Sequence, residues 1–362
     1  MSDLRDEDAR RDLGDTFRRL ISSTGPISLM HFMGESNARY YNDKRVIGAG
    51  GTGGGDFITA PEISQMFGEL IGLWLADMWI RAGRTEPVHY VELGPGKGTL
   101  ARDAQRAMKR YGLNPRMFLI EQSRRMRDQQ LAMVPDAVQY RDLSEVPMEG
   151  PILLVANEFL DALPVRQLVK TVQGWREIMV AVDDAGNFVE TPGRQEMVSA
   201  VPEARRDDPL GTVIETSPAC ATILYEVAGR LADQGGAALF IDYGYVDGRS
   251  GSTLQAVKEH RKIGIFDAPG DSDLTAHVDF AQMEQIARAR SARVLGTVTQ
   301  GEFLTRLGIR DRAEALADFA PQHREALMRA RDRLIAPDQM GDLFKVMGLT
   351  ANDWPDAVGF SE

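Results

Sequence analysis

Residues 90–99 read YVELGPGKGT, and this stretch decides the fold of the chain. Its apolar first half predicts a short β-strand, and the residues from Gly98 to Tyr111 predict a helix. Gly94, Gly96 and Gly98 lie in the turn between them, where glycine allows a ligand to approach the backbone. We therefore expect the first strand–turn–helix unit of an α/β fold, with a ligand bound at the turn.

The details of this turn discriminate among nucleotide ligands. The nicotinamide-type fingerprint G-x-G-x-x-G expects its third glycine one residue later, where this chain has Thr99. A phosphate-binding P-loop is excluded, because Lys97-Gly98 reverses the Gly-Lys order that such a loop needs. Glu92 lies two residues before the first glycine and would repel a diphosphate, whereas it would attract a cation. S-adenosylmethionine carries an ammonium and a sulfonium group, so the pattern favours it as the cofactor.

Strands and helices alternate after this unit. Strands are predicted at 116–121, 137–140, 151–156, 237–242 and 292–298, and helices at 98–111, 123–133, 217–233 and 278–290. This rhythm predicts a doubly wound, mostly parallel sheet. A β-meander at 165–172, 175–182 and 187–190 interrupts it.

We expect four parts in the chain. Residues 1–85 form an N-terminal helical segment, and 86–163 with 217–300 form a Rossmann-like core. Residues 164–216 form a β-rich insertion, and 301–362 a C-terminal addition of helices and a strand. The glycine run GAGGTGGG at 48–55 is open to two interpretations, a surface loop or a mobile lid over the site.

Polar residues follow the later strands of the core. Glu121 ends the second strand, where an acid accepts hydrogen bonds from ribose hydroxyls, although nicotinamide sites share this device. Asp142 and Leu143 come after the third strand, where an adenine amino group can be recognised. Because ligands bind outside the carboxyl ends of parallel strands, we expect these residues to face the crevice of the glycine turn.

The segment after the fourth strand carries the candidate catalytic residues Asn157, Glu158 and Asp161. Two carboxylates and an amide beside a methyl donor suit a cationic nitrogen nucleophile. A guanidinium pairs bidentately with a carboxylate, and a carboxylate can also accept its proton. The alternative interpretation is a capping or turn role for Asn157 and Asp161.

Composition excludes other classes of function. The net charge of −11 argues against a nucleic-acid partner. The single cysteine, Cys220, excludes a disulfide framework within the chain, and no pair of the five histidines has metal-ligand spacing, so we expect no metal. No membrane segment is found, and the acidic residues 1–8 do not resemble a leader. We therefore expect a cytoplasmic protein, with the question of a homodimer left open.

Five motifs resemble those of the MidA-like methyltransferases, the family of mitochondrial complex I assembly factor 7. They lie at 55–64 (GDFITAPEIS), 92–98, 157–164 (NEFLDALP), 241–244 (IDYG) and 273–280 (DLTAHVDF), and the resemblance covers nearly the whole chain. It implies a class I Rossmann-like methyltransferase that uses S-adenosylmethionine. It also implies methylation of an arginine in a protein substrate, a complex I-type quinone-reductase subunit or its equivalent.

The remaining motif residues have gating or substrate-lining interpretations. We expect Asp56 and Thr59 to gate the crevice, with Thr59 and Glu62 in a capping box, and Tyr243 to line the substrate channel. His277 is either a gating or a structural residue. Two other hypotheses stay open: an assembly chaperone that binds a client subunit, and a nicotinamide oxidoreductase.

Overall fold

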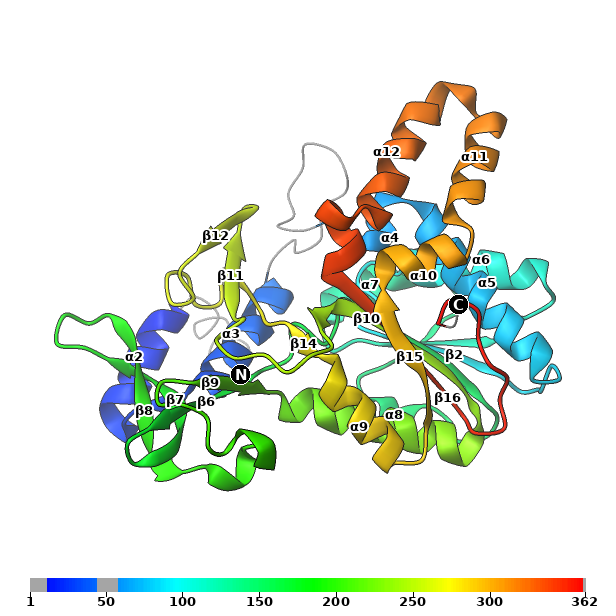
Figure 1. Ribbon diagram of the computed structural model, residues 1–362. Helices are drawn as coiled ribbons and strands as arrows, with labels where there is room; N and C mark the ends of the chain where they lie inside the picture. Colours follow the sequence, from blue (N-terminus) through cyan, green and yellow to red (C-terminus); the bar gives the residue numbers. More distant parts are fainter. Residues whose placement is uncertain (1–11, 44–57, 361–362) are drawn as a thin grey trace, which may run out of the picture. The chain divides into compact units, whose positions relative to one another are not determined.

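The computed structural model describes residues 12–43 and 58–360 (Figure 1). The chain divides into two compact units. The first, which we call the antiparallel unit, contains the described residues up to 43 together with 162–220 and 248–276. The second, the parallel-sheet unit, contains the described residues 58–161, 221–247 and 277–360. Every predicted site residue that is described lies in the parallel-sheet unit.

The parallel-sheet unit is built on a sheet with the strand order β15-β16-β10-β5-β2-β3-β4, and β14 extends β10. The strands are β2 (His89–Leu93), β3 (Arg116–Ile120), β4 (Val138–Tyr140), β5 (Ile152–Asn157), β10 (Gly236–Tyr245), β14 (Val278–Asp279), β15 (Arg293–Thr299) and β16 (Phe344–Thr350). The first five of these and β14 run parallel to one another, whereas β16 is antiparallel to both β10 and β15. The predicted doubly wound, mostly parallel sheet is confirmed.

The order of the strands fixes where a ligand binds. From β2 the chain proceeds to β3 and β4 on one side, and then returns to β5 and β10 on the other side. The direction of winding therefore reverses between β2 and β5. In open α/β sheets ligands bind outside the carboxyl ends of the strands at this switch point. The segments that follow Leu93 and Asn157 are thus the ones that the topology brings to a ligand.

Helices cover both faces of this sheet, with α5 and α6 on one face and α8 and α9 on the other (Figure 1). The helices of the unit are α4 (Ala60–Ile63), α5 (Gln65–Arg81), α6 (Thr99–Arg110), α7 (Arg124–Met133), α8 (Pro218–Gln234), α9 (Phe280–Ala289), α10 (Gln300–Arg306), α11 (Ile309–Phe319) and α12 (Arg324–Ile335). A Cβ on Gly72 of α5 would lie 2.5 Å from the carbonyl oxygen of Ala104 in α6. Glycine thus allows α5 and α6 to pack closely.

Two separate helices, α4 and α5, follow one another between Ala60 and Arg81. Ser64 has extended backbone angles, with φ −161° and ψ 139°, and separates α4 from α5. Its Oγ accepts a hydrogen bond from the backbone N–H of Met66 at 3.2 Å, so it caps the second helix. Because of this break, the axis of α4 does not have to continue that of α5, and α4 can lie beside the glycine turn.

Where the structure describes it, the antiparallel unit contains two sheets and the α-helices α2 and α3. One sheet has the order β1-β7-β6-β9 with β8 paired to β7, and the other has the order β12-β11-β13. The elements are α2 (Leu13–Thr24), β1 (Ile27–Ser28), α3 (Leu29–Asp43), β6 (Arg166–Thr171), β7 (Gly174–Val182), β8 (Phe188–Glu196), β9 (Val213–Thr216), β11 (Gln255–Lys258), β12 (Arg261–Ile263) and β13 (Asp273–Thr275). The predicted meander corresponds to β6, β7 and β8.

The antiparallel unit has a hydrophobic core of its own. Phe17 of α2 and Phe32 of α3 pack with ring centroids 4.8 Å apart, and both rings contact Phe188 of β8. These aromatic side chains bury large apolar surfaces, which accounts for much of the packing energy of a small core. Among the helices of the described residues, none is both long enough and apolar enough to cross a membrane.

Candidate active site

The glycine turn after β2 has the backbone that its sequence predicts. Gly94, Gly96 and Gly98 have φ values of 61°, 53° and 87°, in the left-handed region that favours glycine. A Cβ on Gly94 would lie 2.6 Å from the ring of Phe159, so this position also lacks room for a side chain. Gly98 is the N-cap of α6. The turn is therefore a bare backbone surface at the start of a helix, as a bound ligand requires.

Glu92 is buried on the strand that leads into the turn. Only 3% of its surface is exposed, and the hydroxyl of Tyr90 donates a hydrogen bond of 2.6 Å to its Oε2. Burial raises the pKa of Glu92 to about 8, although the bond from Tyr90 opposes the shift. A cation beside this carboxyl would favour the charged form and lower its pKa again.

Glu121 follows β3, and hydrogen bonds hold its carboxylate. Its Oε1 accepts the backbone N–H of Ser123 at 2.8 Å, and its Oε2 accepts the side-chain amide of Gln130 at 3.3 Å. Burial raises its pKa, while hydrogen bonds from Ser123, Gln130 and Gln122 and the charge of Arg127 lower it. Gln130 did not emerge from the sequence, because one glutamine within a polar helix gives no signal.

Asp142 caps the short helix η1 (Leu143–Glu145). Its Oδ1 accepts hydrogen bonds from the N–H of Ser144 at 2.9 Å and from the hydroxyl of Ser144 at 2.6 Å, and these bonds lower its pKa. Glu145 completes a capping box by accepting the N–H of Asp142 at 3.1 Å. Leu143 is buried. A capping role thus accounts for Asp142 in the structure, and adenine recognition by this pair stays a prediction.

Glu158 has an unusual backbone immediately after β5. Its φ is 49°, a left-handed value that is uncommon for a residue with a side chain and that is concentrated at functional sites. Its Oε1 accepts the N–H of Ala60 at 2.9 Å and the side-chain amide of Asn157 at 3.1 Å. Burial, and to a smaller extent the charge of Asp161, raise its pKa to about 7, against the opposing effects of the two donors and of Arg333.

Asn157 presents an acceptor that the described residues leave open. Its amide nitrogen must face the carboxylate of Glu158, so its Oδ1 points elsewhere. Asn157 is 9% exposed, and among the residues described by the structure this Oδ1 has no hydrogen-bond partner. A buried acceptor without a donor costs about 1–3 kcal/mol. The open oxygen beside the Glu158 carboxylate therefore suits an N–H donor from a ligand.

Asp242 organises the segment that carries these residues. Its Oδ2 accepts the backbone N–H groups of Phe159, Leu160 and Asp161 at 3.1, 2.9 and 3.2 Å, and its Oδ1 accepts the N–H of Tyr243 at 3.0 Å. The residue is 1% exposed. The motif at 241–244 contains Asp242, but the sequence pattern singled out only Tyr243. The buried end of β10 and the segment after β5 are adjacent only in the folded sheet.

The carboxyl groups of Glu158, Asp161 and Asp242 thus lie close together near the carboxyl ends of β5 and β10. Burial, Asp161 and Glu158 raise the pKa of Asp242. Like-charged carboxyl groups in a buried cluster cannot all ionise easily, so a cationic ligand stabilises their charged forms. In residues 12–43 and 58–360, no group of three or more His, Cys, Asp or Glu side chains has the arrangement of a metal site.

The short helix α4 connects the glycine turn to Glu158, and the predicted capping box on it is wrong. Thr59 is the N-cap of α4 but makes no capping bond with its side chain. Glu62 instead accepts a short hydrogen bond from the hydroxyl of Thr99, and it pairs with Lys97 Nζ at 3.6 Å. Glu62 bonds to Thr99 and Lys97 because the fold brings them next to α4. The local spacing Thr-x-x-Glu carries no information about such distant partners. Thr59 itself is half-buried.

Tyr243, predicted to line the substrate channel, and His277 lie against each other. The rings of Tyr243 and His277 are edge-to-face with centroids 5.4 Å apart, and Tyr243 makes a similar contact with Phe344. Both side chains are partly exposed at the end of β10. Asp56 lies outside the described residues. The role of these residues in substrate access stays a prediction.

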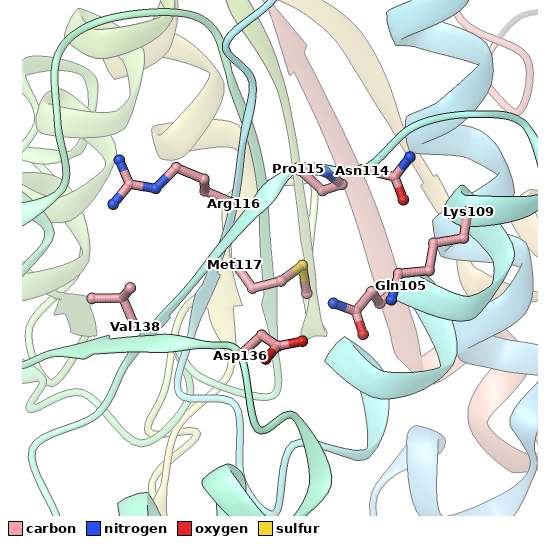
Figure 2. Close-up of a pocket in the computed structure, with 8 residues that line it drawn as sticks. All are labelled: Gln105, Lys109, Asn114, Pro115, Arg116, Met117, Asp136 and Val138. Atoms are coloured by element: carbon pink, nitrogen blue, oxygen red, sulfur yellow. The ribbon is translucent and has the colours of Figure 1, made fainter.

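A separate pocket of about 280 Å³ lies at the amino ends of β3 and β4, away from the carboxyl ends that carry the candidate site (Figure 2). It is lined by residues at the start of β3 and β4 and on α6, among them Gln105, Met117 and Asp136, which lie near one another in Figure 2. Arg116 points away from them. Because ligands of such sheets bind at the carboxyl ends of the strands, this pocket does not belong to the candidate active site.

Comparison with known proteins identifies the class. Residues 70–298 match the family model described as "Putative S-adenosyl-L-methionine-dependent methyltransferase". Proteins of Rattus norvegicus and Homo sapiens named protein arginine methyltransferase NDUFAF7, mitochondrial, are each 35% identical to this chain. The alignments cover 91% of this chain and 82% and 81% of those proteins, respectively.

Solved structures agree with the sequence relatives. A Burkholderia thailandensis protein bound to S-adenosyl-homocysteine has a TM-score of 0.82 and 29% identity, covering 96% of this chain and 93% of that chain. Together, the fold, the glycine turn and these relatives define a Rossmann-like methyltransferase that depends on S-adenosylmethionine. The chain belongs to this family of methyltransferases.

One expectation is corrected by the same comparison. The acidic N-terminal sequence led us to expect a cytoplasmic protein, but the rat, human and Drosophila melanogaster relatives are all named as mitochondrial proteins. The cytoplasmic location is therefore contradicted.

The glycine turn and Glu92 are predicted to bind S-adenosylmethionine, and a contact with Glu92 should make this binding depend on pH. Without ligand this carboxyl binds a proton below about pH 8, and the cationic ligand favours the charged form, so binding releases the proton. We therefore expect the affinity to fall about tenfold from pH 7 to pH 6, because the fraction of ionised Glu92 falls by that factor. The ammonium group of the ligand stays charged in this range.

Isothermal titration calorimetry at several pH values measures this effect. The matched control is Glu92→Gln, which keeps the size of the side chain but cannot titrate; its affinity should be nearly independent of pH. An equal pH dependence in this variant would contradict the role of Glu92.

Proposed function

We propose that this protein transfers a methyl group from S-adenosylmethionine to an arginine side chain of a protein substrate. The observation that carries the proposal is the open acceptor pair formed by Asn157 Oδ1 and the Glu158 carboxyl, held on a left-handed backbone. The relatives named protein arginine methyltransferase support it. An amide oxygen beside a carboxylate favours a guanidinium, which is cationic, planar and carries several N–H donors.

The chain's own residues orient the nucleophile. Glu158 accepts N–H donors of the guanidinium and orients one nitrogen, and Asn157 Oδ1 accepts a further N–H. Bound S-adenosylmethionine supplies the electrophilic methyl group. As the nitrogen–methyl bond forms and the sulfur–methyl bond breaks, the nitrogen loses a proton, and Glu158, with a pKa of about 7 in the absence of substrate, is placed to accept it. Asp242 keeps the segment in this conformation through its three backbone N–H bonds.

A methylation assay tests the proposed substrate class. The purified protein is incubated with labelled S-adenosylmethionine and a lysate of cells that lack the gene, and the labelled proteins are digested and analysed by mass spectrometry. We expect methylated arginine, with a rate that rises as Glu158 ionises near neutral pH. Label found on lysine or on a carboxyl group, with none on arginine, would contradict the proposal.

The first substrate to test is a quinone-reductase subunit of respiratory complex I or its equivalent. The resemblance to mitochondrial complex I assembly factor 7 suggests this subunit, and the relatives share that family. We expect the subunit to be methylated in cells with the gene and unmethylated in cells without it. Methylation of an unrelated protein, with this subunit unchanged, would redirect the search while leaving the arginine chemistry intact.

A further inference from the structure

Gln130 of α7 is a fully buried polar residue that connects two parts of the cofactor site. It has 0% exposure. Its Nε2 donates hydrogen bonds to the carbonyl oxygen of Gly96 at 2.8 Å and to Glu121 Oε2 at 3.3 Å. The turn after β2 and the acid after β3 are thus joined by one amide group. The backbone of Gln130 also lies against the turn, because a Cβ on Gly98 would be 3.5 Å from its Cα.

The orientation of this amide is fixed by a second glutamine. Gln139 Nε2 donates to Gln130 Oε1 at 3.1 Å and also to the carbonyl oxygen of Arg127 at 2.7 Å. Since the carbonyl of Arg127 can only accept, Gln139 must present its nitrogen on this side. Gln130 must then receive this bond with its oxygen and direct its nitrogen toward Gly96 and Glu121. Every hydrogen bond in this series therefore has one donor and one acceptor, and only this orientation of the two amides satisfies them all.

We propose that Gln130 is a positioning residue: its amide is anchored on the carbonyl oxygen of Gly96 and aims the carboxylate of Glu121 at the ribose hydroxyls of S-adenosylmethionine. The inference rests on the proposed ribose contact of Glu121. The amide of Gln130 donates to Oε2 and the N–H of Ser123 donates to Oε1, so each carboxylate oxygen has its own donor and the orientation of the group is restrained. A carboxylate restrained in this way presents its free acceptor positions to the ribose hydroxyls.

The test compares two ligands, S-adenosyl-homocysteine and its 2′-deoxy analogue, by calorimetry. The variant Gln130→Met has a side chain of similar length and no hydrogen bonds. Loss of the positioning bonds should weaken S-adenosyl-homocysteine about tenfold. The 2′-deoxy analogue, which lacks one of the hydroxyls, should lose much less. The preference of the native protein for the full ribose should therefore shrink in this variant.

Three results decide the matter. Equal weakening of both ligands would overturn the positioning role, since a merely structural residue affects them alike, and so would unchanged affinities. If Glu121→Gln keeps the full ribose preference, the ribose contact itself fails, independently of arginine methylation. The matched control is Gln129→Met, an exposed neighbour on the same helix, which should bind both ligands like the native protein.

A milder variant covers the case in which Gln130→Met does not fold. Gln139→Met leaves Gln130 in place but removes the donor that fixes its amide. It should reduce the ribose preference in the same direction and by a smaller factor. A folded Gln139→Met protein with the full preference of the native protein would also count against the proposal.

Discussion

Glu158→Gln loses methyl transfer by a factor of about 10²–10³ and binds S-adenosylmethionine within about twofold of the native protein. The glutamine oxygen can still accept the N–H of Ala60 and the amide of Asn157, so the segment after β5 keeps its conformation. What is lost is the negative charge that holds the guanidinium and receives its proton. Initial rates with labelled cofactor, together with calorimetry for cofactor binding, measure both effects on the same preparation.

The chain offers a close control for this experiment. Glu259 is also a glutamate with a positive φ, 50°, and it lies in the turn between β11 and β12 of the antiparallel unit. Glu259→Gln makes the same chemical change on the same backbone conformation and should leave the rate unchanged. If Glu158→Gln keeps at least a tenth of the native rate, Glu158 does not have the catalytic role that we propose.

Gly94→Ala removes cofactor binding by distorting the glycine turn. Its φ of 61° disfavours any residue with a Cβ, and the new methyl group would lie 2.6 Å from Phe159. Strain and overlap together cost about 2–5 kcal/mol. The turn relieves this cost by moving, so the affinity for S-adenosylmethionine should fall at least about 100-fold. Calorimetry measures the affinity, and thermal unfolding measures how much stability the folded variant has lost.

Gly112→Ala separates strain from overlap. Gly112 has a φ of 81°, and a Cβ there would meet nothing within 4 Å. It follows the far end of α6, about 18 Å from the glycine turn along the helix. We expect a loss of about 1 kcal/mol in stability and no change in affinity. A Gly94→Ala protein that binds the cofactor like Gly112→Ala would show that the turn tolerates a side chain.

The parts of the fold that follow from local pattern could be predicted from the sequence. The glycine turn was visible because three glycines at alternate positions follow an apolar strand, and Glu121 was visible because it ends the next strand. The helix predicted at 217–233 begins with Ser217 and Pro218, which are residue types that favour a helix start, and the structure shows Ser217 Oγ accepting the N–H of Cys220 at 3.3 Å. Each of these signals lies within a few residues of the feature that it predicts.

The residues that were missed act over long distances in the sequence. Asp242 contacts a segment about eighty residues earlier, and Glu62 bonds to Thr99 rather than to the nearby Thr59. Gln130 has partners 34 and 9 residues away on two different loops. No spacing rule connects such pairs, because the sheet order determines which loops meet. The sequence therefore predicted the groups expected to touch the ligands better than the groups that hold them in place.

The strand β16 lies inside the sheet but is made late in synthesis, so the order of synthesis affects how this enzyme folds. It pairs with β10 from Ala237 to Tyr243 and with β15, so it fills the sheet between them although it comes at 344–350 in the chain. While the ribosome is still making these residues, β10 has an open edge, and open edges recruit other strands. The strand that carries Asp242 is therefore the one whose pairing is completed last. A nascent chain needs protection from aggregation until its final residues emerge, and a premature stop codon before residue 344 should yield insoluble protein rather than a weaker enzyme.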